Sequence, residues 1–433
     1  MVQLQFPIVS TPVTQPPALV TEVPGPRSRA LAARLAEVES RNVTCLAPEA
    51  PIFWERAAGA NVWDADGNRF VDLTAGFGVA NAGHGHPRVV EAVCDQADRL
   101  LHAMGDVYPA AVKVRLLEAL AQRYPGGGTV RGVLTSSGAD AVETALKTAL
   151  LATGRAGVIA FEGAYHGLAL GALDATWSAR FRDPFAARLA GATRFARYGD
   201  IDAVRRAARA GGEPPGAVLV EPIQGRGGNR IPPRGFLTDL RALCDDEGWL
   251  LVADEVYTGF GRTGRWFACE HEGVIPDLLC AGKGLASGMP ISACLGRADV
   301  MDTWPASDGE ALHTQTFLGH PPGCAAALAC IAVIEEEKLV ERAARSGAAA
   351  LAQLERRLRE RPGVRDVRGR GLLLGVECDD AARVATACSA ALARGVITLP
   401  CDDTGRVLSI TPPLSIEPEI LESALDVVAE ALG

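Results

Sequence analysis

The chain has 433 residues, of which 48% are hydrophobic, 22% charged and 5% aromatic, a composition typical of a globular protein and unlike that of a disordered or fibrous one. At about 100–200 residues per domain, this length favours two domains. The 52 acidic residues outnumber the 43 basic ones and give a net charge of −9, which argues against a nucleic-acid partner.

Eleven cysteines are scattered along the chain without a Cys-x-x-Cys pair, which favours reduced, mostly buried thiols over a disulfide framework or a zinc site. The longest apolar stretch, residues 321–334, is shorter than the ~18 residues of a membrane span and predicts a buried helix. The N-terminus lacks the basic start and apolar core that export requires. We therefore expect a cytoplasmic protein without a membrane partner.

The N-terminal residues 1–26 contain six prolines and no helical or strand period. They predict an extended arm that either crosses to a partner subunit or stays disordered. Residues 28–39 have the pattern of an amphipathic helix, and residues 62–73 that of a hairpin turning at Asp66 and Gly67. We expect residues 27–75 to join the smaller of the two domains.

Short apolar runs alternate with helical patterns from residue 88 onward. Runs of this length indicate strands that are covered on both faces, as in a parallel α/β sheet. Within a large domain of residues 76–322 we expect strands at 132–136, 157–161, 216–220, 250–254, 278–282 and 291–296.

The C-terminal residues 323–433 have a different pattern, which predicts a separate, smaller α+β domain. Strands are expected near residues 364–377. Helices are expected over residues 321–336, 339–360 and 380–394, and from Glu417 onward.

In open α/β sheets, ligands bind beyond the carboxyl ends of the strands, so the residues that follow each strand are candidates for a site. Ser137, Gly138 and Ala139 follow the first strand and open a helix, whose free N–H groups and positive dipole end suit a phosphate. The alternative is that Ser137 only caps this helix. After the second strand, Tyr165 and His166 lie between two glycines, either to stack on a planar ligand ring or as part of a surface loop.

Two carboxylates end the next two strands. Glu221 opens a glycine-rich segment, and Asp254 lies at the tip of what is expected to be a central buried strand. A buried carboxylate needs a cationic partner, because leaving it unpaired costs several kcal/mol. That partner is either an arginine or the protonated nitrogen of a heterocycle.

The chain has only four lysines, at positions 113, 147, 283 and 338. We expect Lys113 and Lys147, within helices, and Lys338, at a helix junction, to be solvated. Lys283 instead follows an apolar strand and lies among glycines and alanines, where its pKa would be lowered and its amine could form an imine. A phosphate-binding turn, a stacking aromatic, an aspartate for a ring nitrogen and an imine-forming lysine together describe a site for pyridoxal 5'-phosphate.

These residues belong to seven ordered motifs. From about residue 51 to the C-terminus the sequence resembles the class III (ω-amino acid type) aminotransferases, which are fold type I pyridoxal-phosphate enzymes. The resemblance implies a large domain with a mostly parallel, seven-stranded type of sheet covered by helices, plus a smaller α+β domain. The motifs are GHGHP (83–87), SSGADAVETALK (136–147), GAYHG (163–167), EPIQGRGG (221–228), ADEVYTGFGRTG (253–264), AGKGLASGMP (281–290) and TFLGHP (316–321).

By this resemblance, Lys283 is the lysine that forms the Schiff base with the cofactor, and Asp254 is the partner of the pyridine nitrogen. Val256 and Tyr165 are expected to lie on the two faces of the ring. His166 and Glu221 are expected to complete the cofactor site.

The resemblance also implies that Ser137, Gly138 and Ala139 hold the phosphate together with Thr316 of the neighbouring subunit. Since each site would then need two chains, we expect a homodimer with shared active sites.

The sequence departs from the pattern of many class members at two positions. Leu168 follows the Tyr-His-Gly motif and Ser409 precedes the Pro-Pro-Leu segment, at places where carboxylate-binding arginines are common. Loss of these arginines should weaken recognition of a substrate carboxylate there. Phe77 and Tyr257 are candidate walls of the substrate pocket, and the candidate replacement arginines are Arg226, Arg262, Arg370 and Arg406.

The expected activity is a ping-pong aminotransferase reaction, in which a primary amine or ω-amino compound gives its amino group to a 2-oxo acid such as pyruvate or 2-oxoglutarate. Two alternatives stay open from the sequence. One is an amino-acid racemase or epimerase with the same site. The other is a nucleotide-binding or non-catalytic scaffold protein.

Overall fold

The computed structural model describes residues 14–45 and 51–433. The first half of the predicted arm, residues 1–13, lies outside the described residues. The rest of the arm runs along its own chain: the Ala18 N–H donates to the Arg69 carbonyl at 2.9 Å, and the Arg69 N–H donates back to Ala18 at 2.8 Å. The arm ends where helix α1 (Pro26–Val38) begins.

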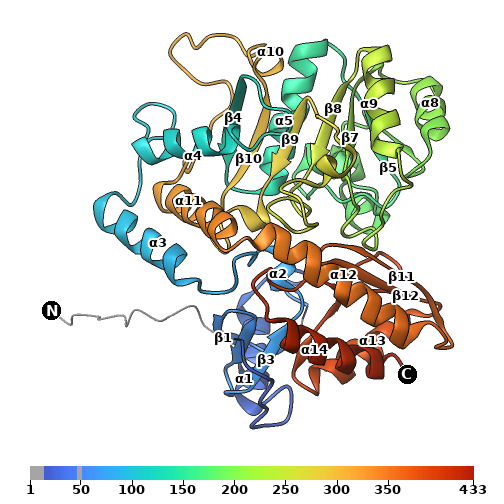
Figure 1. Ribbon diagram of the computed structural model, residues 1–433. Helices are drawn as coiled ribbons and strands as arrows, with labels where there is room; N and C mark the ends of the chain where they lie inside the picture. Colours follow the sequence, from blue (N-terminus) through green and yellow to red (C-terminus); the bar gives the residue numbers. More distant parts are fainter. Residues whose placement is uncertain (1–13, 46–50) are drawn as a thin grey trace.

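A seven-stranded sheet forms the centre of the large lobe (Figure 1). Its strand order is β4-β10-β9-β8-β7-β5-β6. β10 is antiparallel to both of its neighbours and the other pairs are parallel. The predicted mostly parallel sheet is thus confirmed. The strands are β4 (Val130–Thr135), β5 (Gly157–Phe161), β6 (Thr193–Ala196), β7 (Pro215–Val220), β8 (Leu250–Asp254), β9 (Leu278–Ala281) and β10 (Ser292–Arg297).

Both faces of this sheet are buried, which explains the continuous apolar runs. In β7, Ala217 and Leu219 pack against α5 (Gly138–Thr153), while Val218 and Val220 belong to the core on the opposite face. Helices cover the sheet on either side, as Figure 1 shows. The other helical segments of this lobe are α3 (Pro87–Arg99), α4 (Ala111–Ala121), α6 (Leu170–Asp174), α7 (Ala179–Arg182), α8 (Ile201–Arg209), α9 (Phe236–Glu247), α10 (Ala298–Met301), η1 (Asp183–Arg188), η2 (Ala268–Glu272) and η3 (Lys283–Leu285).

Two four-stranded sheets form the small lobe. The predicted hairpin is present as β2 (Asn61–Asp64) and β3 (Arg69–Asp72), next to β1 (Trp54–Ala58). β13 (Val396–Ile397) adds to β3 in parallel, so an N-terminal and a C-terminal segment share one sheet. The second sheet is antiparallel and comprises β11 (Val364–Arg370), β12 (Leu373–Cys378), β15 (Val407–Ile410) and β14 (Leu399–Pro400).

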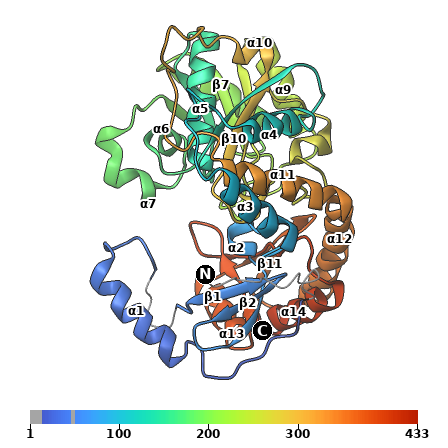
Figure 2. The ribbon, with the colours of Figure 1, turned by 90° about the vertical axis from the view of Figure 1, so that its left-hand side faces the viewer.

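Four long helices connect and cover the lobes. α11 (Pro321–Glu336) is the predicted buried helix and packs against α3 and α4. α12 (Leu339–Leu358) extends from the large lobe along the small one, as both Figure 1 and Figure 2 show. α13 (Ala381–Leu392) and α14 (Pro418–Ala431) complete the small lobe. The expected domain boundaries at residues 75 and 322 stay predictions.

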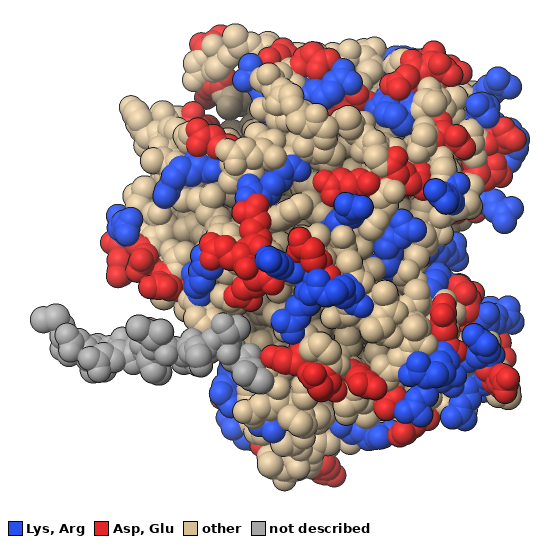
Figure 3. All heavy atoms as spheres, in the orientation of Figure 1, with Lys and Arg blue, Asp and Glu red and all other residues tan. Residues whose placement is uncertain are grey.

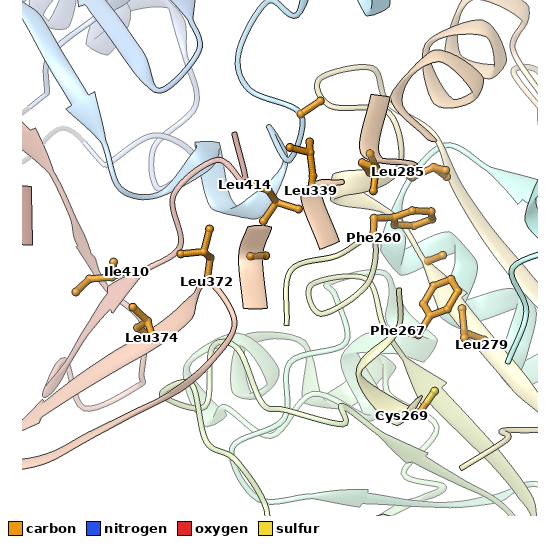
Figure 4. Close-up of a cluster of buried hydrophobic side chains, with 14 of the residues drawn as sticks. Phe260, Phe267, Cys269, Leu279, Leu285, Leu339, Leu372, Leu374, Ile410 and Leu414 are labelled. Carbon is orange, nitrogen blue, oxygen red and sulfur yellow. The ribbon is translucent and has the colours of Figure 1, made fainter. Parts of the chain in front are cut away.

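One hydrophobic core runs from the large lobe into the small one. Figure 4 shows Phe260 and Leu285 of the large lobe in the same cluster as Leu339, Leu372 and Leu414. The short, strained α2 (Ala75–Gly78), with φ between 48° and 73° at all four residues, lies where the lobes meet.

Charged side chains of both signs are interspersed over the face of the molecule in Figure 3. Within residues 14–45 and 51–433, no helix is both long enough and apolar enough to span a bilayer.

Candidate active site

A cavity of about 940 Å³ lies at the carboxyl ends of β5, β7, β8 and β9. The small lobe closes its other side with residues of β14, β15 and the segment around α2. The structure therefore brings together residues that lie far apart in the sequence, such as Thr74 and Thr411, which are 337 residues apart. The predicted residues in its lining are Phe77, Ser137, Gly138, Ala139, Tyr165, His166, Leu168, Glu221, Arg226, Asp254, Val256, Tyr257, Lys283 and Ser409.

The N-terminus of α5 opens into this cavity. Ser137 is the N-cap, and its Oγ accepts a hydrogen bond from the Asp140 N–H at 3.2 Å, so the capping role considered above is present. Gly138 is the first helical residue, and a Cβ there would lie 2.8 Å from Val256 Cγ1. Only glycine lets Val256 approach the helix so closely, and the free backbone N–H groups beside it suit an anion.

Asp254 ends β8 at the floor of the cavity and is 4% exposed. Its Oδ2 accepts a hydrogen bond from His166 Nδ1 at 2.7 Å, and its Oδ1 accepts one from the Val256 N–H at 3.1 Å. Among the described residues no arginine pairs with Asp254, so the arginine alternative is wrong. His166 Nε2 is buried and has no hydrogen-bond partner in the described part of the chain, so it is available to form a hydrogen bond with a ligand in the cavity.

Glu221 follows β7 and accepts hydrogen bonds from the Tyr165 N–H at 3.1 Å and the Gly225 N–H at 3.2 Å. Burial raises the pKa of this carboxyl to about 7; the nearby Asp254 charge adds to the rise and His166 opposes it. Glu221 thereby fastens the loop that carries Tyr165 to the loop that carries Arg226.

Lys283 begins η3, with one residue between it and the end of β9, and its backbone lies in the left-handed region at φ 39°. A non-glycine residue there is strained, and such strain is characteristic of functional sites. Burial lowers the pKa of the Lys283 amine, against the opposing charges of Asp254 and Glu221. A lowered pKa leaves more of the amine in its neutral, nucleophilic form.

The other three lysines are placed differently. Lys147 and Lys338 are exposed, as expected. Lys113 is half-buried and its Nζ donates to the Gly105 carbonyl at 2.6 Å, so the expectation that it is solvated is wrong.

Aromatic side chains form much of the cavity wall. The Arg226 guanidinium carbon lies 4.8 Å from the ring centroid of Tyr165 and 5.4 Å from that of Phe181. The ring of Tyr257 lies 4.4 Å from Lys283 Nζ. Phe77 lines the cavity and is 63% exposed.

The four candidate replacement arginines occupy different places. Arg226 is the only arginine among the described residues of the lining, and no carboxylate of the described chain pairs with it. Arg262 is fully buried and donates to the carbonyls of Leu372 and Pro412. These hydrogen bonds link the two lobes, so the side chain is not available to a substrate. Arg370 and Arg406 lie outside the lining, and Arg406 is exposed.

Thr316 is exposed and does not line the cavity of its own chain.

Several lining residues were not predicted from the sequence: Cys45, Thr74, Cys401 and Thr411, with Leu399 and Pro400 of β14. Of the C-terminal residues that line the cavity, only Ser409 had been singled out from the sequence.

The cavity fits pyridoxal phosphate. It offers free N–H groups for a phosphate at the start of α5, a carboxylate for a ring nitrogen and an amine of lowered pKa. His166 Nε2, which has no partner among the described residues, lies in the same space.

A family model described as aminotransferase class-III matches residues 45–432. The chain belongs to this family. An acetylornithine aminotransferase of Methanopyrus kandleri is 42% identical over 384 residues, covering 88% of this chain and 94% of its own. A 4-aminobutyrate aminotransferase of Mycobacterium leprae is 39% identical and covers 98% of this chain and 99% of its own.

The solved structures agree with this assignment. The ornithine aminotransferase of Toxoplasma gondii, with partial occupancy of PLP at its active site, has a TM-score of 0.85 at 33% identity and covers 93% of this chain and 94% of its own. This class III aminotransferase is therefore a fold type I enzyme that depends on pyridoxal phosphate, and its reaction is transamination. The racemase and scaffold alternatives are not favoured, since these relatives are named aminotransferases.

Proposed function

We propose that this class III aminotransferase takes the amino group of a primary amine or a long ω-amino compound and passes it to pyruvate or 2-oxoglutarate in a ping-pong cycle. The observation that carries the proposal is the lining of one cavity. Lys283, Asp254 and the start of α5 meet there, while Leu168 and Ser409 stand at the two positions where the sequence departs from the carboxylate-binding arginines.

We assign the following roles to the residues of the chain. When bound, pyridoxal phosphate supplies a ring that accepts the electron pair left when the donor carbon loses a proton. Lys283 Nζ is the amine that would hold the cofactor covalently; once free, it would take the proton from the donor carbon and pass it on. Asp254 holds the proton on the ring nitrogen, and its bond from His166 fixes the orientation of the carboxylate.

The remaining contacts follow from the positions of the side chains in the wall. Ser137, Gly138 and Ala139 bind the phosphate through the free N–H groups of α5. Val256, which packs on Gly138, and Tyr165, on the opposite loop, would contact the ring of the bound cofactor.

Substrate recognition is proposed to differ between the two half-reactions. Phe77, Tyr257 and Leu168 contact an apolar donor, and Arg226 binds the carboxylate of the 2-oxo acid. Arg226 suits this role because it lines the cavity and no carboxylate of the described chain neutralises it. Arg406 was the other candidate, and its place outside the lining does not support it.

We also propose a homodimer in which Thr316 reaches the phosphate bound by the partner. Its exposed position outside its own cavity supports this, as does the apolar character of nearby exposed residues. Thr314 Oγ1 donates to Asp106 Oδ2 at 2.8 Å and joins the two loops that carry them. The exposed apolar side chains on these loops are Met104, Val107, Tyr108, Leu312 and Phe317.

A cytoplasmic location is proposed from the cysteines. All eleven are free thiols, and seven of them are buried. We expect no nucleic-acid or membrane partner, in line with the acidic net charge.

Specificity constants test the proposal. The purified holoenzyme is assayed with 4-aminobutyrate, N-acetylornithine, and simple aliphatic and aromatic amines, each with pyruvate and with 2-oxoglutarate. A charged hydrogen bond from arginine contributes about 1.5–3 kcal/mol, so its loss should shift donor preference by about tenfold or more toward amines without a carboxylate. A clear preference for 4-aminobutyrate or N-acetylornithine would falsify the donor assignment.

A further inference from the structure

We propose that Tyr257 is a positioning residue for Lys283: the face of its ring holds Nζ in place and stabilises the proton that this amine carries. The inference rests on the proposed role of Lys283 in proton transfer. Tyr257 would then position Lys283 in addition to lining the substrate pocket.

The contact itself has the geometry of a cation–π interaction. Lys283 Nζ lies 4.4 Å from the ring centroid of Tyr257, within the range of about 6 Å over which such contacts are attractive. Tyr257 is half-buried in the cavity wall. An ammonium group at this position is attracted to the ring, whereas a neutral amine is not.

Two glycines from distant parts of the chain fix the ring in this orientation. A Cβ on Gly225 would lie 2.7 Å from Tyr257 Cδ1, and a Cβ on Gly78 would lie 2.9 Å from Cε2. These atoms belong to opposite edges of the ring. The backbone at these two glycines therefore packs against both edges of the Tyr257 ring, and one face of the ring is left toward Lys283.

The hydroxyl anchors the far end of the ring. Thr411 Oγ1 donates its one proton to the Thr74 carbonyl at 3.2 Å. The 3.3 Å contact between Tyr257 Oη and Thr411 Oγ1 must then be donated by the tyrosine. Burial raises the pKa of Tyr257, so the hydroxyl stays protonated and able to donate.

Several charges act on Nζ besides the ring. Asp254 and Glu221 favour its protonated form, Arg226 disfavours it, and burial disfavours it most. His166 also lies beside this group, because its Nδ1 is hydrogen-bonded to Asp254 Oδ2 at 2.7 Å. In this balance the ring supplies a stabilisation that does not depend on pH, because it carries no titrating charge below the pKa of the phenol.

A second role for the ring predicts the opposite result, which makes the inference testable. If Tyr257 only excluded water, its removal would hydrate Lys283 and raise the pKa of the amine toward its ordinary value. If the ring face stabilises the ammonium, its removal lowers that pKa further. The direction of the change thus separates the two roles.

The first experiment uses the cofactor-free protein. Trace acetylation with acetic anhydride is measured at each lysine between pH 6 and 11, and peptide mass spectrometry gives the pKa of each amine. With only four lysines, every site is followed in one digest, and the exposed Lys147 and Lys338 serve as internal references.

We expect Tyr257→Met, which keeps an apolar side chain but has no ring, to lower the pKa of Lys283 by about 1. Tyr257→Phe keeps the ring and should leave the pKa within about 0.3 of the wild-type value. Phe77→Leu removes another aromatic of the wall and should not change the pKa. If Tyr257→Met does not fold, Gly225→Ala displaces the ring instead and should also lower the pKa.

A rise or no change in the pKa of Lys283 in Tyr257→Met would overturn the inference. An equal drop in Tyr257→Phe would assign the effect to the hydroxyl and also overturn it. Because acetylation needs no turnover, its outcome is independent of the donor assignment, which fails only in the specificity assay.

The second experiment uses the holoenzyme. A positioning role predicts that Tyr257→Met lowers kcat by about tenfold, with a smaller change in the KM of an amine donor and a larger primary deuterium isotope effect for the α-deuterated donor. A rise in KM alone, at unchanged kcat and isotope effect, would make Tyr257 a substrate contact and refute the inference.

Discussion

At the scale of single residues, the burial of Glu221 has a consequence for stability. Its native pKa of about 7 lies above the ordinary value near 4.5, so the native state keeps a proton that the unfolded chain has lost between these values. The free energy of unfolding of the cofactor-free protein should therefore fall as the pH rises from about 4.5 to 7, by up to about 3 kcal/mol from this group.

Glu221→Gln should remove this dependence. The variant cannot ionise, so its thermal midpoint should vary less with pH over this window than that of the wild type. Its stability relative to the wild type should be lowest near pH 4.5 and rise toward pH 8. Glu162→Gln, at the exposed end of β5, is the matched control and should follow the wild type. Parallel curves for wild type and Glu221→Gln would mean that Glu221 ionises normally.

Arg226 carries the second residue-scale prediction. If it binds the acceptor carboxylate, Arg226→Met should raise the KM of the 2-oxo acid by about tenfold or more and leave the KM of an amine donor nearly unchanged. Arg406→Met removes an exposed arginine outside the cavity and should change neither KM. Equal effects of Arg226→Met on both substrates would point to a general loss of wall structure.

At the scale of elements, the junction of α5 with β8 sets the shape of the phosphate end of the site. Gly138→Ala would place a Cβ 2.8 Å from Val256 Cγ1, so Val256 or the start of α5 must move. Overpacking of this kind costs about 1–3 kcal/mol, and we expect cofactor affinity to fall about tenfold. Fluorescence titration of the cofactor-free protein measures this, with the exposed Leu150→Ala on the same helix as control.

Elements with strong periodicity were predictable. α11 has the predicted bounds, and the six predicted strands of the large sheet are present, because residues such as Leu219 and Val220 are buried on opposite faces. The strand β6 was missed because it is a four-residue edge strand of intermediate burial. β13 and β14 were missed because two residues carry no periodic signal.

The site was predictable in part for the same physical reason. Side chains at the carboxyl ends of parallel strands meet at one edge of the sheet. For this reason Glu221, Asp254 and Lys283 could be proposed as site residues from the sequence alone. The partner of Asp254 was not predictable, because His166 reaches it from 88 residues away through the path of a loop. The contact of Tyr257 with Lys283 likewise depends on two glycines whose proximity only the fold creates.

At the scale of the whole molecule, the shared core implies cooperative unfolding. Phe260, Leu285 and Leu339 pack in the same cluster as Leu372 and Leu414, so neither lobe keeps its core without the other. The buried Arg262 adds hydrogen bonds across the same junction.

The proposed dimer yields a complementation test. Lys283→Ala chains should be inactive, and Thr316→Ala chains should bind cofactor weakly. If Thr316 serves the partner's site, a mixed dimer has one site with both changes and one fully wild-type site. Subunit exchange between the two variants should then restore activity at low cofactor concentration. No gain on mixing, with mixed dimers detected by mass, would show that Thr316 does not act in the neighbouring site.

The close packing of Gly78 and Gly225 against Tyr257 also constrains how this sequence can change over evolutionary time. Alanine at position 225 collides with the ring as long as Tyr257 is present, and the backbone there has no positive φ to forbid alanine otherwise. Once Tyr257 has been replaced by a smaller residue, alanine at 225 fills the vacated space. The two substitutions are thus acceptable in one order and harmful in the other, and after the second, a return to tyrosine is blocked. Lineages that lose this aromatic should rarely regain it.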